Sequence, residues 1–306
     1  MPEINTIAVI GSGSVGSYYG ARLALKHRVT FLMRRDLEAV RENGLIIHSV
    51  DGDFHLNPVR AFRSTDEIGP VDLVIIALKT TANAILPEIV PPLLKQGTIL
   101  LTLQNGLGNE DLLHRTFPGH PILGGLCFVC INRGEPGVIH HLAHGRVEMG
   151  ELTDTATIQS VASLFTDAGL DCRILPDLGL ARWRKLIWNV PFNGLSIAGG
   201  GIDTQQILAN PALLDRTRAL MHEIIAVAAA LGHGIDPAFA ESNIKGTLEM
   251  GAYQPSSLVD FLAGNAVEVE AIWGEPLRQA KAHGIVTPEL EKLYFEICGA
   301  TGNRPD

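Results

Sequence analysis

The segment from residue 183 to 193 places polar side chains in an otherwise apolar helical pattern. Lys185, Asn189 and Asn193 are spaced four residues apart, so in a helix all three share one face. Asparagine is a poor helix former, and a polar stripe between tryptophans is typical of a lined cleft. Burial beside apolar side chains lowers the pKa of a lysine, which can then donate a proton near neutral pH. The pattern predicts a proton donor in a cleft, and a helix–helix contact with satisfied amides is the alternative.

Polar residues also follow two expected strands, at 71–78 and 99–103. Lys79 follows the first strand and Asn105 follows the second. Ligands of an open parallel sheet bind at the carboxyl ends of its strands. There Lys79 can reach a phosphate or the substrate, and Asn105 offers both a donor and an acceptor. A solvated lysine and an ordinary Asn-Gly turn are the alternatives.

A glycine-rich loop follows the first apolar run of the chain. Its sequence is Gly11-Ser12-Gly13-Ser14-Val15-Gly16. Gly11 would make a tight turn, Gly13 would let the backbone approach a pyrophosphate, and Gly16 would allow close packing of helix on strand. The helix N-terminus then offers amide donors to the phosphates. A glycine-rich turn without a ligand is the alternative, but the place between strand and helix predicts dinucleotide binding.

The end of the second expected strand indicates which dinucleotide binds. An NAD site usually has an acidic residue there, on the ribose 2′-OH. Here Arg34 and Arg35 come first, and guanidinium groups suit a 2′-phosphate. Asp36 follows late and is expected to cap the next helix. We therefore predict NADP as the cofactor, with arginines on a solvated surface as the alternative.

Near the C-terminus, two serines precede an expected helix that contains Glu268 and Glu270. Ser256 could cap this helix or place its hydroxyl on a substrate carboxylate. A glutamate that faces the cleft could pair with Lys185. Helical spacing alone makes either glutamate more typical of a solvated surface.

The first half of the chain alternates short β-rich runs with helical patterns. Strand–helix alternation with short connections predicts a parallel, doubly wound sheet. Residues 121–150 have alternating patterns and turn glycines, which predict antiparallel or edge strands that close the sheet. Strands are expected at 7–10, 29–33, 71–78 and 99–103, and helices at 14–26, 37–43 and 81–94.

Helical periodicity dominates the second half, from residue 178 on. No convincing strand pattern remains after about residue 175. We therefore expect an N-terminal Rossmann-type α/β domain at 1–176, followed by an all-helical C-terminal domain at 177–306. Helices of this second domain are expected at 178–195, 212–231, 237–249, 257–283 and 288–299.

Composition excludes several classes of protein. Apolar residues make up 46% and charged residues 19% of the 306 positions, which is typical of globular chains. With 24 basic and 33 acidic residues the net charge is −9, which disfavours nucleic-acid binding. No stretch approaches the roughly 20 apolar residues of a membrane helix, and no basic region precedes the first apolar run. Four cysteines do not suggest a disulfide framework, so a cytoplasmic enzyme is expected.

Two clusters could in principle bind a metal ion. Cys127 and Cys130 form a single CxxC in an apolar, strand-like run, whereas zinc sites need four ligands and redox CxxC pairs begin helices. His140 and His141 are adjacent, and adjacent strand residues point to opposite faces. With His144 they are expected to be exposed strand and turn residues. No metal site is predicted.

Taken in order, these motifs resemble the ketopantoate reductase family, also called 2-dehydropantoate 2-reductases. The resemblance runs nearly from end to end. It rests on GSGSVG at 11–16, ALKT at 77–80, QNGLGNE at 104–110, WRKLIWNVPFN at 183–193, PSSLVDFLAGNAVEVEAIWG at 255–274 and EPLRQAKAHGIVTPELEKLY at 275–294.

The resemblance implies NADPH-dependent reduction of a 2-oxo acid in a cleft between the two domains. Reduction of 2-dehydropantoate to pantoate, a step of pantothenate biosynthesis, is the best single candidate. By the same resemblance, Lys185 is the general acid, and Glu268 binds the substrate hydroxyl and orients Lys185. Residues implied to hold the substrate are Asn105, Asn189, Asn193 and Ser256. Those implied to hold NADP are Gly11, Ser12, Gly13, Ser14, Val15, Gly16, Arg34, Lys79 and Asn105.

The sequence departs from the family in places. Gly194 stands where the family usually has proline, and a changed lining at 194–201 would alter substrate choice. The serine that the resemblance implies for substrate binding could be Ser256 or Ser257. We choose Ser256, because matching both it and Glu268 to the family pattern needs no alignment gap. A related dehydrogenase for a different hydroxy acid and a non-catalytic NADP sensor are the competing functions. The helical half, rich in leucine and alanine, could supply a homodimer interface.

Overall fold

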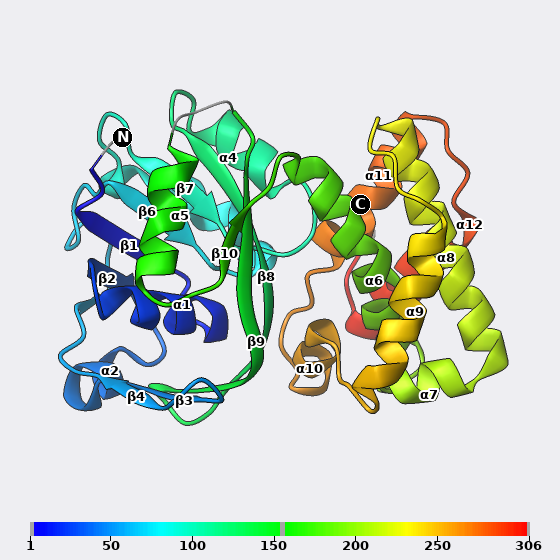
Figure 1. Cartoon of the computed structure of the whole chain (residues 1–306), viewed down its shortest axis with the longest axis horizontal. Coiled ribbons are helices and arrows are strands. Elements are labelled where there is room, and N and C mark those ends of the chain that lie inside the picture. The colour runs from blue at the N-terminus through cyan, green and yellow to red at the C-terminus, as the bar shows by residue number, and fades with distance from the viewer. Residues whose placement is uncertain (1–2, 154–156, 305–306) are drawn as a thin grey trace. The chain divides into compact units, whose positions relative to one another are not determined.

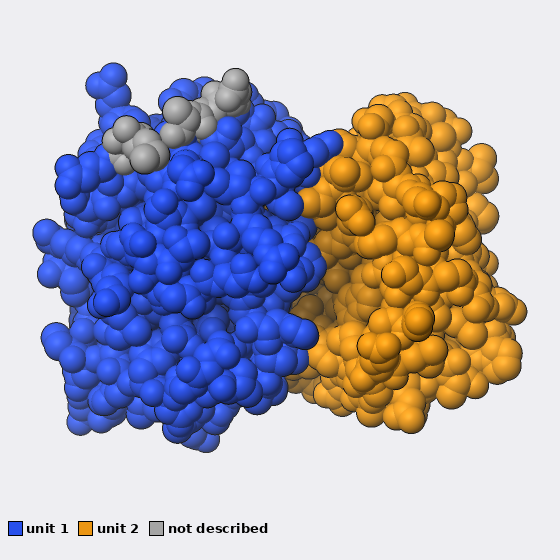
Figure 2. Space-filling view, in the orientation of Figure 1, with its two compact units in different colours: residues 1–104, 109–178 blue, residues 105–108, 179–306 orange. Residues whose placement is uncertain are grey.

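The computed structural model describes residues 3–153 and 157–304. The chain forms two compact units, coloured separately in Figure 2. Unit 1 contains residues 1–104 and 109–178, and unit 2 contains residues 105–108 and 179–306. The short segment 105–108 therefore belongs to unit 2, although the chain on either side of it belongs to unit 1.

Unit 1 is built on a mixed ten-stranded sheet with the order β4-β3-β9-β8-β7-β6-β1-β2-β5, in which β10 also pairs with β9 (Figure 1). The central strands β2, β1, β6 and β7 pair in parallel, as predicted, and β8 also pairs in parallel with β7. Its strands are β1 Thr6–Ile10, β2 Arg28–Leu32, β3 Leu45–Ser49, β4 Phe54–Leu56, β5 Ala61–Phe62, β6 Leu73–Ile76, β7 Ile99–Thr102, β8 Ile122–Arg133, β9 Val138–Glu151 and β10 Cys172–Ile174.

Both faces of the central part of this sheet are buried. Successive residues of a strand point to opposite sides, so alternate residues report on the two faces. In β1, Ile7 and Val9 pack in one apolar cluster, and Ala8 and Ile10 pack in another. The first cluster includes residues of α1, α2 and α5, and the second includes residues of α3 and α4. The sheet is thus doubly wound, which confirms the predicted fold class. The helices of unit 1 are α1 Ser14–Ala24, α2 Leu37–Asn43, α3 Leu86–Ile89, α4 Asn109–Thr116 and α5 Ile158–Asp167.

The long β8–β9 hairpin confirms the predicted antiparallel pairing at 121–150, with register shifts after Phe128 and Cys130. The expectation that this segment closes the sheet is wrong, because β3 and β4 follow β9 in the strand order. The continuous helix expected at 81–94 is wrong. Two short 3₁₀ helices, η1 Thr80–Ile85 and η2 Pro91–Leu93, flank α3 instead. Pro91 and Pro92 lack a backbone N–H, so a regular helix cannot continue through them.

Unit 2 is helical throughout its described residues, as expected (Figure 1, green to red). Its core contains Trp183, Phe192 and Trp273, with leucines and isoleucines of α6, α8 and α12 around them. Helix α8 begins in the predicted place because Asn210 accepts hydrogen bonds from the first-turn amides of Ala212 and Leu213. Its helices are α6 Leu178–Ala198, α7 Thr204–Ala209, α8 Pro211–Ala230, α9 Ala238–Met250, α10 Ser256–Leu262, the π-helical turn η3 Glu270–Gly274, α11 Glu275–Ala282 and α12 Pro288–Thr301.

The single helix expected at 257–283 is wrong, and so is the placement of Glu268 on it. Helix α10 ends at Leu262, because Gly264 adopts a φ of +67° and Asn265 N donates to Asp260 O at 2.9 Å. This is the glycine-terminated end that many helices share. Glu268 consequently lies in the non-helical link that leads to η3. None of the described helices is long and apolar enough to cross a membrane.

Candidate active site

The glycine loop of unit 1 joins β1 to α1, and close packing explains two of its glycines. Gly11 has a φ of +93°, and a Cβ there would lie 2.3 Å from Leu78 N. A Cβ on Gly16 would lie 2.3 Å from Gly11 O. In contrast, a Cβ on Gly13 would meet no atom of the described chain within 4 Å, so its backbone is open to a ligand. This division of roles fits a pyrophosphate cradle.

The N-terminus of α1 is suited to an anion. Gly13 is its N-cap residue, and no described side chain caps the helix. The first turn contains no acidic residue that would repel a phosphate. Exposed amides and the positive end of the helix dipole therefore face the loop. Ser12 Oγ donates to Leu32 O at 2.9 Å and ties the loop to the end of β2.

The end of β2 presents Arg34 and Arg35, which are exposed, and Asp36, which is buried. Asp36 is the N-cap residue of α2, as expected, but its side chain makes no capping hydrogen bond. It forms an ion pair with Arg133 and accepts a hydrogen bond from Gly137 N at 3.3 Å instead. The predicted capping role is therefore wrong, because a tertiary partner takes the carboxylate. The side chains left exposed at this strand end are guanidinium groups.

A buried amide network joins the ends of β6 and β7. Gln104 is 3% exposed. Its Nε2 donates to Leu78 O at 3.0 Å and to Asn83 Oδ1 at 2.7 Å, and its Oε1 accepts from Thr102 Oγ1 at 3.0 Å. These bonds hold the loop that carries Lys79, an exposed residue at the start of η1. Gln104 belongs to the QNGLGNE motif at 104–110 but was not among the predicted site residues.

In unit 2 the structure brings together two of the predicted residues that lie far apart in the sequence. Lys185 Nζ, on α6, donates to Asn105 Oδ1 at 3.0 Å. Both side chains are half-buried. An ammonium has three N–H donors, and this bond directs one of them at the amide oxygen of Asn105.

Asn193 joins α6 to the start of α10. The residue is 1% exposed; its Oδ1 accepts from Ser257 N at 2.8 Å, and its Nδ2 donates to Asn189 O at 3.1 Å. Ser257 is buried, whereas Ser256 is exposed. The amide of Asn193 thus holds the serine segment against the α6 face. A direct role of Asn189, Asn193 or Ser256 in substrate binding stays a prediction.

The two glutamates near the C-terminus differ in environment. Glu270 accepts a hydrogen bond from Tyr294 Oη at 2.7 Å and forms an ion pair with Arg278. Glu268 is 5% exposed, in the link before η3. Glutamate is seldom buried unless its carboxylate has a specific partner, so this burial points to a defined role for the side chain. Of the two, Glu268 is the candidate for chemistry.

Gly194 is required by the core of unit 2. A Cβ there would lie 2.6 Å from Leu293 Cδ2 and 2.8 Å from Trp273 Nε1. The indole of Trp273 donates to Val190 O at 3.0 Å and cannot retreat without losing that bond. Residues 194–197 are buried on α6, and the helix ends where Gly200 and Gly201 adopt positive φ. Packing therefore accounts for the departure from proline at 194.

We expect Gly194→Ala to lower the free energy of unfolding by about 1–3 kcal/mol, because the added methyl overpacks a rigid core. Gly246→Ala is the matched control, since Gly246 lies within α9 and its Cβ would meet no described atom within 4 Å. That change should stabilise the helix by about 0.5–1 kcal/mol. Urea unfolding followed by tryptophan fluorescence reports on unit 2, which contains Trp183, Trp188 and Trp273. Equal effects of the two substitutions would contradict the packing argument.

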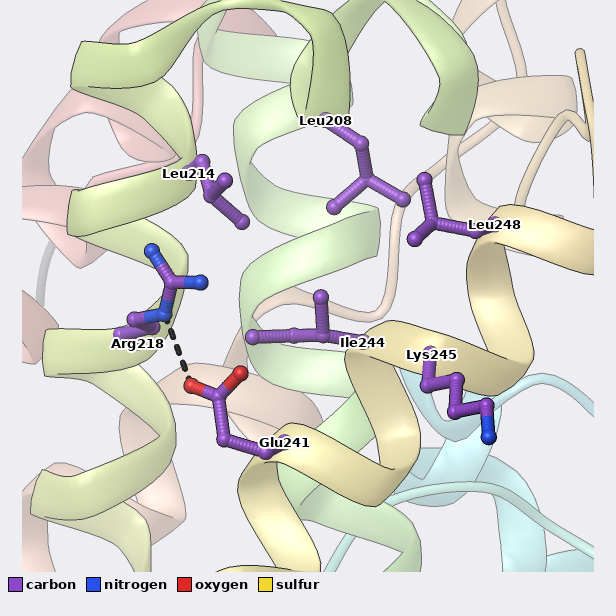
Figure 3. A pocket seen from close by; sticks show the side chains of 7 residues that line it. All are labelled: Leu208, Leu214, Arg218, Glu241, Ile244, Lys245 and Leu248. Carbon is purple, nitrogen blue, oxygen red and sulfur yellow. Dashed lines mark hydrogen bonds and ion pairs between the residues drawn. The ribbon is translucent and has the colours of Figure 1, made fainter.

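A pocket of about 200 Å³ in unit 2 lies among α7, α8 and α9 (Figure 3). Its side chains are Leu208, Leu214, Ile244, Leu248, Lys245, and the ion pair of Arg218 with Glu241. It contains none of the predicted site residues. Neither Lys185 nor Asn105 lines this pocket.

The described residues contain no group of three or more His, Cys, Asp or Glu side chains that could hold a metal ion. Cys127 and Cys130 lie on β8 and form no disulfide bond in the described chain. The expectation that His141 is exposed is wrong. Its side chain is buried, with the ring 4.5 Å from the Tyr18 ring and Nδ1 2.8 Å from Ser49 Oγ.

The sheet order and the glycine loop place unit 1 in the Rossmann class, with a helical second unit. Comparison with protein families identifies the member of that class. The family described as "Ketopantoate reductase PanE/ApbA" matches residues 7–154, and "Ketopantoate reductase PanE/ApbA C terminal" matches residues 177–298. The chain belongs to the ketopantoate reductase family and is an oxidoreductase, which confirms the resemblance.

Individual relatives agree with this assignment. A 2-dehydropantoate 2-reductase of Nostoc sp. is 38% identical over 298 residues, which cover 95% of this chain and 93% of that protein. The crystal structure of 2-dehydropantoate 2-reductase from Geobacter metallireducens GS-15 is 43% identical, with a TM-score of 0.93 over 97% of this chain and 100% of that chain. The crystal structure of 2-dehydropantoate 2-reductase from Methylococcus capsulatus is 34% identical, with a TM-score of 0.88 over 95% of this chain and 94% of that chain.

Proposed function

We propose that this protein reduces a 2-oxo acid with NADPH and that 2-dehydropantoate, which becomes pantoate, is its substrate. The observation that carries the proposal is the hydrogen bond between Lys185 Nζ and Asn105 Oδ1 in a member of this family. It joins the one predicted proton donor to a predicted substrate residue. The names of the relatives supply the substrate class.

The chemistry requires a proton donor at the substrate oxygen. A bound nicotinamide supplies a hydride to the carbonyl carbon and is itself oxidised. As the new C–H bond forms, the carbonyl π electrons move to the oxygen, which becomes negatively charged. The Lys185 ammonium stabilises this charge and gives the oxygen its proton. Asn105 holds the ammonium in one orientation, so that the proton is delivered along a fixed direction.

Glu268 would accept a hydrogen bond from a hydroxyl of the substrate. Pantoate and its 2-oxo precursor carry such a hydroxyl, whereas simple 2-oxo acids do not. A substrate that lacks the hydroxyl would forgo this hydrogen bond, so Glu268 would favour hydroxylated substrates. Asn189, Asn193 and Ser256 are the remaining candidates for the substrate carboxylate and hydroxyl groups.

The residues of unit 1 fit the proposed cofactor. The pyrophosphate would bind at residues 11–16, where the Gly13 backbone is open and α1 presents its N-terminus. The 2′-phosphate would bind Arg34, because Asp36 at the same strand end is engaged by Arg133. Lys79 is the N-cap residue of η1, after the carboxyl end of β6, and would complete the cofactor side.

We expect Arg34→Ala to raise the KM for NADPH about 10- to 100-fold, because one hydrogen-bonded charge on the 2′-phosphate is lost. The KM for NADH, which has no 2′-phosphate, should stay unchanged. Arg28→Ala is the matched control, since Arg28 is an exposed arginine at the other end of the same strand. A similar change for both cofactors would contradict NADP selectivity at Arg34.

The proposed function is tested with the purified protein, by following NADPH absorbance with 2-dehydropantoate and with a panel of other 2-oxo acids. We expect the highest kcat/KM with 2-dehydropantoate. A higher kcat/KM with another 2-oxo acid would show that the protein is a dehydrogenase for a different hydroxy acid. Tight NADPH binding without oxidation by any member of the panel would favour a sensor.

A further inference from the structure

The π-helical turn η3 leaves one backbone carbonyl without its helical donor. Glu275 N donates to Glu270 O, five residues earlier. The same spacing would pair Ala271 O with the backbone nitrogen of residue 276. That residue is Pro276, which has no N–H. Single π turns are often found at functional sites, where a displaced carbonyl can serve a new partner.

The segment 105–108 uses this carbonyl. Leu107 N donates to Ala271 O at 2.9 Å. Ala271 is buried, and the Leu107 side chain packs against the apolar core of unit 2. The buried hydrogen bond from Leu107 N and the apolar packing of the Leu107 side chain together hold the segment 105–108 on η3.

Gly106 makes this approach possible. Its φ is +82°, and a Cβ would lie 2.3 Å from Ala271 O and 2.7 Å from Ala271 Cβ. Both the backbone conformation and the close approach therefore require glycine. Asn105, immediately before it, is the residue whose Oδ1 accepts the hydrogen bond from Lys185.

We propose that the Ala271 carbonyl, freed by the π turn and by Pro276, is the docking point that positions Asn105 on Lys185. Gly106 and Pro276 are then positioning residues for the proton donor. Gly106 permits the approach, and Pro276 withholds the N–H that would compete with Leu107. The effect on catalysis rests on the proposed function, whereas the docking itself does not.

The test compares three variants. Gly106→Ala introduces the clash with Ala271, and Pro276→Ala restores a backbone N–H five residues after Ala271. Gly97→Ala is the control for backbone strain, because Gly97 has a φ of +83° and its Cβ would meet no described atom within 4 Å. The first readout is hydrogen exchange of the Leu107 amide, together with the side-chain amide resonance of Asn105, by NMR. The second readout is kcat/KM for 2-dehydropantoate.

We expect slow exchange of the Leu107 amide in the unaltered protein and in Gly97→Ala. Exchange should be at least about tenfold faster in Gly106→Ala and should also increase in Pro276→Ala, with a shifted Asn105 resonance in both. A misplaced catalytic group can cost about 100-fold, so kcat/KM should fall by about that factor in Gly106→Ala and by less in Pro276→Ala. If Gly106→Ala does not fold, Pro276→Ala carries the same two readouts.

Fast exchange of Leu107 in the unaltered protein would overturn the docking. The positioning role would be overturned if the Leu107 amide of Gly106→Ala lost its protection while the Asn105 resonance and kcat/KM stayed unchanged. Failure of the proposed function looks different. In that case no 2-oxo acid would support NADPH oxidation by the unaltered protein. The Leu107 amide would still be protected from exchange, and the Asn105 resonance would still shift in both variants.

Discussion

Lys185→Ala is expected to lower kcat for NADPH-dependent reduction of 2-dehydropantoate by about 10³-fold, within the range that general acid catalysis supplies. The proton that Lys185 would give to the substrate oxygen must then come from water, and the developing charge loses its ammonium. NADPH affinity should change little, because the glycine loop and Arg34 belong to unit 1. Stopped-flow absorbance with saturating NADPH measures kcat, and fluorescence titration measures cofactor affinity.

Two further variants make this result specific. Lys185→Arg keeps the positive charge, but a guanidinium does not release its proton near neutral pH, so kcat should remain low. Lys245→Ala removes an exposed lysine on α9 of the same unit, labelled in Figure 3, and should leave kcat unchanged. A Lys185→Arg variant with full activity would show that charge alone, without proton transfer, is needed. A fully active Lys185→Ala variant would remove Lys185 from the mechanism.

Glu268→Ala should lower kcat/KM for 2-dehydropantoate by about 10²- to 10³-fold, the loss seen when one partner of a buried charged hydrogen bond is truncated. Most of this loss should fall on KM, because the hydroxyl that Glu268 would bind is remote from the transferred hydride. Glu268→Gln keeps an acceptor oxygen and should lose less. The discrimination between 2-dehydropantoate and a 2-oxo acid without a hydroxyl should shrink in both variants.

Glu223 supplies the matched control for a carboxylate in unit 2. Its oxygens accept from Glu289 N at 2.9 Å and Leu290 N at 2.8 Å, so it caps the first turn of α12. Glu223→Gln should lower the Tm through the weakened cap while leaving KM unchanged. If Glu268→Ala lowers the Tm by the same amount and leaves KM unchanged, its role is structural and the substrate assignment fails.

Local patterns predicted the parallel core of unit 1 well, because a strand buried on both faces must be apolar at every position. Strand β6 is apolar throughout, and β1 and β7 are apolar except for one terminal threonine each, so their places follow from the sequence. Strands β3 and β4 were not anticipated. They are short and only partly buried, and β3 pairs with β9, which lies far along the chain. Such strands are decided by their partners, and no local period marks them.

Two local rules were overruled in ways that the structure explains. The periodic pattern at 257–283 continues through Gly264, but a glycine in the left-handed conformation ends α10 there. That signal was present in the sequence and could have been used. Asp36 occupies the expected N-cap position of α2, but its carboxylate binds Arg133. No sequence rule could name a partner from the far end of the β8 strand.

The sequence by itself determined the glycine loop, the parallel strands β1, β2, β6 and β7, and the spacing that puts Lys185, Asn189 and Asn193 on one face of α6. Each of these depends on the period of one element or on the φ freedom of glycine, which are properties of neighbouring residues. Only the tertiary structure decided that Asn105 meets Lys185 and that Ser257, not Ser256, is buried beside Asn193. Those contacts join segments far apart in the chain. Their free energy comes from packing and hydrogen bonds that exist only after the helices of unit 2 have assembled.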